Sequence, residues 1–393
     1  MQSDSSTGHL LEGITVLNLG SVGPAARAAR ALADYGARVV QIAPVSKKGA
    51  LQTRPVYHTY GAGRDFQRMR IDLKAPAGRE ALLRLTEKAD VLIESFRPGA
   101  VDRLGIGWDV VHARSPHLIY CSTSGYGQDG PASTWAGHDL NYLAMSGFLA
   151  CSEARPDGGP PIPGATVADS AGGGMQAVLS ITAALVRRAT TGQGTRLDVS
   201  AAEGALSLMA LSIDQFLAEG EIAGPREVLL TGRYACYDLY ETSDGKWISV
   251  AAIESHFFAN LCDRLGLPEF KSDQYSDEKQ DEIRAALKRS FKTRTRDEWT
   301  AELAPNDTCV APVLTIPEVV EDPHWRARGV FMEADCEGRG VFEQVSPILA
   351  GGVRAHARHR VRAGSETDSV DLLALAGYSE AEVETLMGEG AVE

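Results

Sequence analysis

Short apolar segments alternate with amphipathic segments through the first half of the chain. Apolar runs bounded by turn residues predict buried strands, and apolar residues spaced three or four apart predict the helices between them. The expected strands cover residues 14–20, 37–43, 90–96 and 118–127, and the expected helices cover 24–36 and 77–89. Strands that alternate with helices form a parallel sheet with right-handed crossovers. This half therefore predicts a Rossmann-like α/β domain.

The pattern of apolar and polar residues changes near residue 228. Residues 236–253 alternate apolar and polar side chains on both sides of a turn at 243–245, which predicts a β-hairpin. Helices are expected in this region within 256–266 and 278–291. Before it, a long helix is expected within 172–194, and a strand followed by a second long helix within 196–221. This second region predicts a smaller α+β domain.

A chain of 393 residues has the length of two domains. We predict a large Rossmann-like domain over 1–200, a connecting helix over 201–227, a small α+β domain over 228–325, and a return segment with a C-terminal helix that packs on the large domain over 326–393. Near the end, Ser379 precedes Glu382 by three residues. This capping-box pattern predicts a surface helix.

The composition is that of a globular protein, with 44% hydrophobic and 23% charged residues. The net charge of −13 argues against nucleic-acid and membrane-surface partners, so an anionic ligand would need a local basic pocket. The six cysteines form no CxxC pair, which predicts reduced thiols. We see no signal-peptide pattern and no apolar run of membrane-spanning length, so we expect a cytoplasmic protein.

Three common kinds of site lack their motif. The first strand leads into a helix, but Asn18 stands where the first glycine of G-x-G-x-x-G belongs, ahead of Gly20 and Gly23. The second strand offers Gln41 in place of the acidic residue that binds a ribose. There is no G-x-S-x-G elbow, and the nine histidines form no HxH or HxxxH pair. Nicotinamide binding, serine hydrolysis and a metal site are therefore disfavoured.

Three polar residues stand at junctions that lead into helices: His138, Asp169 and Glu254. Taken singly, the histidine is interpreted as a structural residue whose hydrogen bonds are satisfied, and the two carboxylates are interpreted as helix caps. Together, a histidine and a carboxylate on opposite sides of a substrate carbon can carry a proton across it. Glu254 would then orient the imidazole. Backbone N–H groups of residues 172–175 would face an enolate oxygen at a helix N-terminus.

The sequence resembles the alpha-methylacyl-CoA racemases, a branch of the family III CoA-transferases, over about residues 10–350 and again in the tail. The resemblance rests on stretches such as "GPAARAARALADYGARVV", "ADVLIESFRPGAVDRLGIGWD", "AGHDLNYLAMSG", "VADSAGGGM" and "CVAPVL". It implies that His138 and Asp169 are the two α-proton acid/bases and that Glu254 hydrogen-bonds the histidine. Transferases usually carry an aromatic residue in place of His138, and they use the aspartate as a nucleophile.

The resemblance also implies an interlocked homodimer, with the active site between the large domain of one chain and the small domain of its partner. The coenzyme A site maps onto Ile71, Asp72, Leu73, Lys74, Ser95, Phe96, Arg97, Arg103, Gly137, Asp139, Leu140, Asn141 and Tyr142. Lys74, Arg97 and Arg103 are cations suited to phosphates. The chain departs from the family pattern at Gln41, where racemases usually have a basic residue, and in the rearranged basic run of residues 61–70.

These observations favour a racemase that transfers a proton at the α-carbon of a 2-methyl-branched acyl-CoA through an enolate. No cofactor is expected beyond the CoA moiety of the substrate. One alternative is a CoA-transferase with Asp169 as nucleophile, and another is an acyl-CoA-binding protein without activity. His138 favours the racemase.

Overall fold

The computed structural model describes residues 9–45, 61–351 and 358–393. The chain divides into two compact units, which we describe separately. The first unit comprises residues 1–146, 163–209 and 323–393, and the second comprises 147–162 and 210–322. Within the described ranges, no helix has both the length and the apolar character that crossing a membrane requires.

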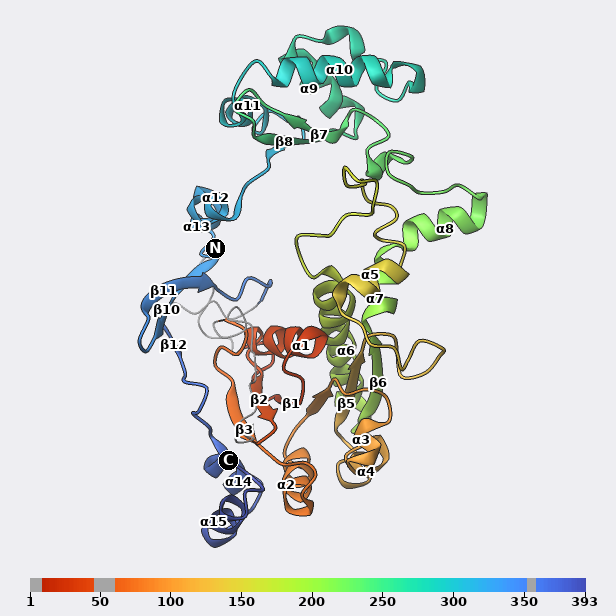
Figure 1. Cartoon of the computed structure of the whole chain (residues 1–393). Coiled ribbons are helices and arrows are strands. Elements are labelled where there is room, and N and C mark those ends of the chain that lie inside the picture. Colours follow the sequence, from red (N-terminus) through yellow and green to blue (C-terminus); the bar gives the residue numbers. More distant parts are fainter. Residues whose placement is uncertain (1–8, 46–60, 352–357) are drawn as a thin grey trace. The chain divides into compact units, whose positions relative to one another are not determined.

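The first unit is built on a six-stranded parallel sheet with the order β3-β2-β1-β4-β5-β6 (Figure 1). Its strands are β1 (Thr15–Asn18), β2 (Arg38–Ala43), β3 (Gln67–Arg70), β4 (Val91–Glu94), β5 (Ile119–Ser124) and β6 (Thr195–Ser200). The strand order reverses between β1 and β4. In open sheets of this kind, ligands bind beyond the carboxyl ends of the strands at such a reversal. The predicted α/β fold class is confirmed.

Helices cover both faces of this sheet because apolar side chains point to both sides of each strand. One face carries α1 (Gly23–Asp34) and α6 (Gln176–Thr191), packed on Val16, Ile93 and Ile119. The other face carries α2 (Pro76–Thr86), α4 (Trp108–Arg114), α14 (Ser369–Leu375) and α15 (Glu380–Gly388). Ser379 caps α15 through the expected capping box with Glu382.

Shorter elements complete the first unit. They are α3 (Ala100–Arg103), α5 (Asp139–Met145), the π-helix η2 (Ala168–Met175), α7 (Ala201–Leu208), α13 (Pro323–Ala327), β10 (Phe331–Cys336), β11 (Gly340–Val345) and β12 (His359–Val361). The last three strands form a separate sheet with the order β11-β10-β12. The helix expected within 196–221 is two helices, because α7 ends at Leu208 and the chain enters the second unit at Ala210.

The glycines of η2 and α7 permit a very close approach of the two helices. A methyl group on Gly172 would lie 2.7 Å from the carbonyl oxygen of Ala201, and one on Gly204 would overlap the carbonyl group of Gly172. On the opposite side, a methyl group on Gly173 would lie 2.5 Å from the ring of Pro24 in α1. The helix η2 thus contacts the backbone of α7 on one side and the Pro24 ring of α1 on the other, at distances that only glycine allows.

We expect Gly204→Ala to lower the free energy of unfolding by about 1–3 kcal/mol, because the added methyl group meets backbone that cannot rotate away. Denaturant unfolding measures this change. Gly388→Ala is the matched control, since this helical glycine has open space around it and its substitution leaves stability equal or higher. Equal stability of the two variants would contradict the close packing of η2 on α7.

The second unit contains a three-stranded antiparallel sheet of β7 (Tyr237–Glu241), β8 (Trp247–Ala251) and β9 (Val310–Pro312). The hairpin predicted for residues 236–253 is confirmed, and Gly245 adopts a φ of 74° in its turn. The helices of this unit are α8 (Ala210–Glu219), η3 (Leu229–Thr231), α9 (Ser255–Leu265), η4 (Pro268–Phe270), η5 (Asp277–Lys279), α10 (Gln280–Phe291), α11 (Arg296–Leu303) and α12 (Ile316–Glu321). Buried aromatic side chains such as Tyr240 and Phe291 form its core.

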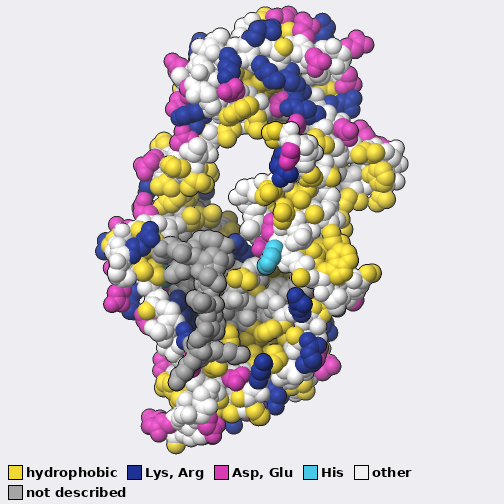
Figure 2. Space-filling view, viewed as in Figure 1, with side chains coloured by type: hydrophobic (Ala, Val, Ile, Leu, Met, Phe, Trp, Pro, Cys, Tyr) yellow, Lys and Arg dark blue, Asp and Glu magenta, His cyan; other side chains and the backbone are white. Residues whose placement is uncertain are grey.

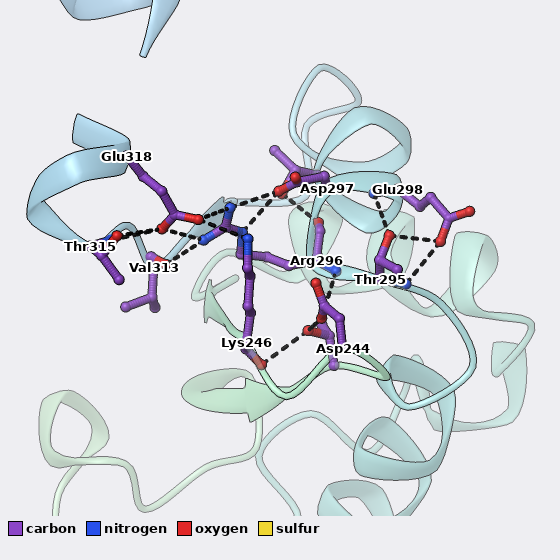
Figure 3. Close-up of polar contacts among 11 residues, drawn as sticks. Asp244, Lys246, Thr295, Arg296, Asp297, Glu298, Val313, Thr315 and Glu318 are labelled. Carbon is purple, nitrogen blue, oxygen red and sulfur yellow. Dashed lines mark hydrogen bonds and ion pairs between the residues drawn. The ribbon is translucent and has the colours of Figure 1, made fainter. Parts of the chain in front are cut away.

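An ion-pair network ties α11 and α12 together (Figure 3). Arg296 is only 4% exposed, and its guanidinium donates to both carboxylate oxygens of Glu318 at 2.9 Å and to the carbonyl oxygen of Val313. Lys246 also binds Glu318 at 2.8 Å, and Glu318 accepts the Thr315 N–H that begins α12. These bonds, led by those from Arg296, hold the pKa of Glu318 far below its ordinary value.

The ionised Glu318 therefore stabilises the fold above its ordinary pKa of 4.5, and this contribution is lost as the pH falls below that value. We expect Glu318→Gln to lower the thermal unfolding midpoint at pH 7, with a difference from the unsubstituted protein that shrinks at pH 4 and below. Glu269→Gln, which removes an exposed carboxylate of the same unit, is the control for net charge. A difference that stays constant from pH 7 down to pH 2 would contradict this role.

Candidate active site

A pocket of about 390 Å³ opens at the carboxyl ends of the adjacent strands β4 and β5. The loop that follows β4 and the residues that end β5 form one side, and residues 135–138 with the start of α5 form the other. Seven of the residues that the sequence predicted for the site line this pocket: Ser95, Phe96, Arg97, Gly137, His138, Asn141 and Tyr142. The pocket thus lies next to the reversal of strand order, where the fold is expected to bind a ligand.

His138 is the N-cap residue immediately before α5. Its backbone is extended, with φ −130° and ψ 178°, and its N–H donates to the side chain of Asn141 at 3.0 Å. The Asn141 N–H returns a bond of 2.8 Å to the carbonyl oxygen of His138. This reciprocal pairing fixes the backbone of His138 and leaves its exposed imidazole on the pocket wall.

A cluster of aromatic rings supports the turn that carries His138. The Tyr142 hydroxyl donates to the carbonyl oxygen of Gly137 at 2.6 Å, and its ring stands edge-on to Tyr126 at 5.1 Å. Both tyrosines pack so closely on Gly137 that a methyl group there would lie 2.7 Å from the Tyr126 hydroxyl. Tyr126 in turn contacts Trp135 edge-on at 6.0 Å on the pocket rim. Sequence reasoning missed Tyr126 and Trp135.

Asp169 lies in the first turn of η2 and is half-buried. It is not an N-cap, because the helix begins at Ala168 after Val167 and the Asp169 side chain makes no capping bond. Instead, its own N–H donates to the carboxylate of Asp139 at 2.8 Å. Asp139 directly follows His138, so this bond joins the turn that carries the histidine to the turn that carries Asp169.

Burial raises the pKa of Asp169, and the negative charge of Asp139 raises it further. The positive charges of Arg27 and His138 act in the opposite direction with smaller effects. The net result is a carboxyl group that holds its proton to higher pH than an ordinary aspartate.

The expectation for the backbone of residues 172–175 is wrong. Residues 172–175 lie in the interior of a helical segment that starts at Ala168 and continues into α6, so their N–H groups do not form a helix N-terminus. The glycines among them are buried against α1 and α7. These glycines allow close packing of the helices.

The other predicted coenzyme A residues lie outside this pocket. Ile71 is buried and pairs with Val392, while Lys74 is exposed at the end of the turn that follows β3, where its N–H donates to Asp72 at 3.0 Å. Leu73 packs against the core of the first unit. Arg103, in α3, and Leu140, in α5, are exposed.

The basic run of residues 61–70 binds the chain itself. Arg64 is 3% exposed and pairs with Asp34 at 3.1 Å. Arg68 donates to the carbonyl oxygen of Ala363 at 3.1 Å, and Arg70 donates to that of Gly364 at 2.6 Å. Arg68 and Arg70 therefore hold the C-terminal segment, beside a second cavity of about 230 Å³.

Gln41, which stands where related proteins were expected to have a basic residue, lines this second cavity. Its side chain exchanges hydrogen bonds with Asn18, accepting from the Asn18 amide at 2.8 Å and donating to the Asn18 carbonyl oxygen at 3.1 Å. Asn18 also bonds both backbone groups of Gly20. Gln41 thus supports the loop that follows β1.

Glu254 belongs to the second unit and occupies the residue before α9. It is exposed, and its side chain makes no capping hydrogen bond, so it does not cap that helix through its carboxylate. Its predicted interaction with His138 remains a prediction.

Comparison with known proteins places the chain in a family. A sequence profile of CoA-transferase family III matches residues 11–360. The human alpha-methylacyl-CoA racemase is 37% identical over 86% of this chain and 86% of its own length. A succinyl-CoA–D-citramalate CoA-transferase of Chloroflexus aurantiacus is 30% identical over 81% of this chain and 82% of its own length.

Among solved structures, a CAIB/BAIF family protein from Brucella suis superposes with a TM-score of 0.71 at 27% identity, covering 84% of this chain and 90% of that one. Three observations agree with one another. They are the six-stranded sheet, the pocket beside its reversal of strand order, and the sequence likeness along most of the chain. The protein belongs to CoA-transferase family III.

Proposed function

We propose that this protein is a racemase that moves a proton at the α-carbon of 2-methyl-branched acyl-CoA thioesters. The observation that carries this proposal is the bond between Asp139 and the Asp169 N–H, which brings the turn of the imidazole and the turn of the carboxyl group together. One group removes the α-proton, an enolate forms, and the other group returns a proton to the opposite face. Glu254 is proposed to support the charged form of His138.

The raised pKa of Asp169 supports this assignment over nucleophilic chemistry. A carboxyl group that holds its proton to higher pH than an ordinary aspartate is better suited to act as a general acid, whereas a nucleophile must be ionised. In the pocket, Arg97 offers the positive charge that an acyl-CoA phosphate needs on a protein of net charge −13. Lys74 and Arg103 are proposed to extend this contact.

CoA transfer is the second candidate function, favoured by the 30% identity to a succinyl-CoA–D-citramalate CoA-transferase. In that reaction the ionised Asp169 attacks the thioester carbonyl carbon, the carbon–sulfur bond breaks, and CoA leaves as the thiolate. The resulting mixed anhydride on Asp169 is trapped by hydroxylamine. The racemase forms no such covalent intermediate.

We also propose a homodimer, in keeping with the resemblance to interlocked relatives. The single chain leaves large apolar side chains exposed, including Leu179 and Val186 on α6 and Leu217 on α8 at 66%, 73% and 75%. Figure 2 shows hydrophobic side chains gathered at the surface around α8. Apolar patches of this kind are typical of interfaces.

Incubation of a single enantiomer of a 2-methylacyl-CoA in ²H₂O tests the proposed function. We expect both epimers to form, with deuterium at the α-carbon. Absence of α-exchange together with a hydroxylamine-sensitive adduct on Asp169 would overturn the proposal in favour of CoA transfer. Binding of the thioester with neither reaction would identify a protein that binds acyl-CoA without converting it.

A further inference from the structure

Asp139 occupies a special position between the two proposed proton-transfer residues. It is the first residue of α5, its Cα lies about 3.8 Å from that of His138 as the next residue in the chain, and its carboxylate accepts the Asp169 N–H at 2.8 Å. We propose that the side chain of Asp139 is a positioning residue that sets both the placement and the protonation of Asp169. This inference rests on the proposed racemase function, and it assigns Asp139 a role other than coenzyme A binding.

The placement follows from the hydrogen bond. A carboxylate that accepts a backbone N–H forms a charge-assisted bond, which is about twice as strong as a neutral one. Asp139 is separated from Asp169 by 30 residues, so the bond joins two segments that the local chain does not hold together. Asp139 directly follows His138 in the chain, and it binds the backbone of Asp169. A shift of η2 relative to α5 therefore changes the distance between Asp169 and His138.

The protonation follows from the surrounding charges. Four neighbouring groups interact electrostatically with the Asp169 carboxyl group. Three belong to the α5 segment, namely Asp139, His138 and Tyr142, and the fourth is Arg27 of α1. Asp139 favours the protonated form of Asp169, and Arg27 and His138 favour the ionised form. Arg27 is otherwise held by a bond to Thr166 at 3.3 Å. Asp139 and Arg27 therefore act on the same carboxyl group with opposite signs.

Two variants distinguish the effect of Asp139 on the placement of Asp169 from its effect on the protonation of Asp169. Asp139→Asn keeps an oxygen that accepts the Asp169 N–H but removes the charge, whereas Asp139→Ala removes both. In the direction of epimerisation where Asp169 supplies the proton, the rate falls as the pH rises through the pKa of Asp169. We expect Asp139→Asn to move this limb of the pH profile to lower pH by about 1 pH unit, and Arg27→Gln to move it to higher pH.

Asp139→Ala also loosens η2 relative to His138. A misplacement of about 1 Å in an active site costs about 100-fold in rate, so we expect kcat to fall by about 10- to 100-fold while KM for the acyl-CoA changes little. A rise in KM with kcat unchanged would overturn the positioning role and support coenzyme A binding by Asp139. Asp129→Asn, which removes an exposed carboxylate from a nearby turn, is the control for net charge.

A direct titration of Asp169 separates this inference from the proposed function. Infrared difference spectra between each protein and its Asp169→Asn counterpart isolate the Asp169 carboxyl band across a pH series. We expect the Asp169 midpoint to be lower in Asp139→Asn than in the unsubstituted protein, and higher in Arg27→Gln. An unchanged midpoint in Asp139→Asn would overturn the inference, whether or not the protein epimerises its substrate. Absence of epimerisation in the unsubstituted protein would instead overturn the proposed function.

Discussion

Replacing His138 by alanine will lower the rate of α-epimerisation by about 100- to 10,000-fold, the range that a positioned general acid or base contributes. The imidazole lines the pocket at the end of β5, and the alanine side chain leaves no group there that exchanges a proton. The reciprocal bonds between His138 and Asn141 use backbone atoms of His138, so the turn survives the substitution. The rate is measured by chiral chromatography of the acyl-CoA after timed incubation.

The matched control is His9→Ala, which removes an exposed histidine outside the pocket. It should epimerise at the rate of the unsubstituted protein. Circular dichroism and the unfolding midpoint of His138→Ala should also match those of the unsubstituted protein. A folded His138→Ala protein that epimerises at the full rate would remove the histidine from the mechanism.

The second large effect is expected for Asp169→Asn, which should also lose about 100- to 10,000-fold in epimerisation. The amide has the size of the carboxyl group and removes a half-buried acid whose pKa is raised by burial and by Asp139. The N–H of residue 169 still donates to Asp139, because that bond uses the backbone. We therefore expect the unfolding midpoint to stay the same or rise, since the repulsion between two carboxylates is relieved.

The same variant distinguishes the two candidate reactions. If the protein is a racemase, hydroxylamine does not change the epimerisation rate of the unsubstituted protein or of Asp169→Asn. If it is a transferase, hydroxylamine inactivates the unsubstituted protein during turnover by capturing the acyl group on Asp169. Full epimerisation by a folded Asp169→Asn protein would contradict both assignments for this residue.

The parallel sheet and the hairpin could be predicted because their signals are local. Apolar runs separated by helical periodicity place β1, β2, β4 and β5 within a few residues of their observed bounds, and the alternation around residues 243–245 identifies the β7–β8 hairpin. The break between α7 and α8 was missed because residues 201–219 remain helical in pattern. It arises where the chain passes from one unit to the other.

The sequence predicted which residues belong to the candidate site, but it did not predict the contacts among them. The motif around His138 identified the pocket wall, but the glycines of residues 172–174 look the same in sequence whether a ligand or a helix approaches them. Asp169 resembled an N-cap because an acid before a helical stretch usually is one. The acid that binds the backbone there, Asp139, comes from 30 residues earlier in the chain.

Long-range partners also explain the basic run. Arg64, Arg68 and Arg70 have the composition of a phosphate site, yet the carbonyl oxygens that they bind lie 281 to 295 residues away in the chain. The local sequence does not distinguish an arginine that binds a distant segment of the chain from an arginine that binds a phosphate.

The most direct test of the two-base arrangement is exchange of each pure enantiomer of a 2-methylacyl-CoA in ²H₂O by His138→Ala and Asp169→Asn. Each variant retains one group on one face of the α-carbon. We predict that both variants epimerise about 100- to 10,000-fold more slowly than the unsubstituted protein, that each exchanges the α-proton of one enantiomer preferentially, and that the two variants select opposite enantiomers. Exchange of the same enantiomer by both variants would contradict a histidine and a carboxyl group on opposite faces of one carbon.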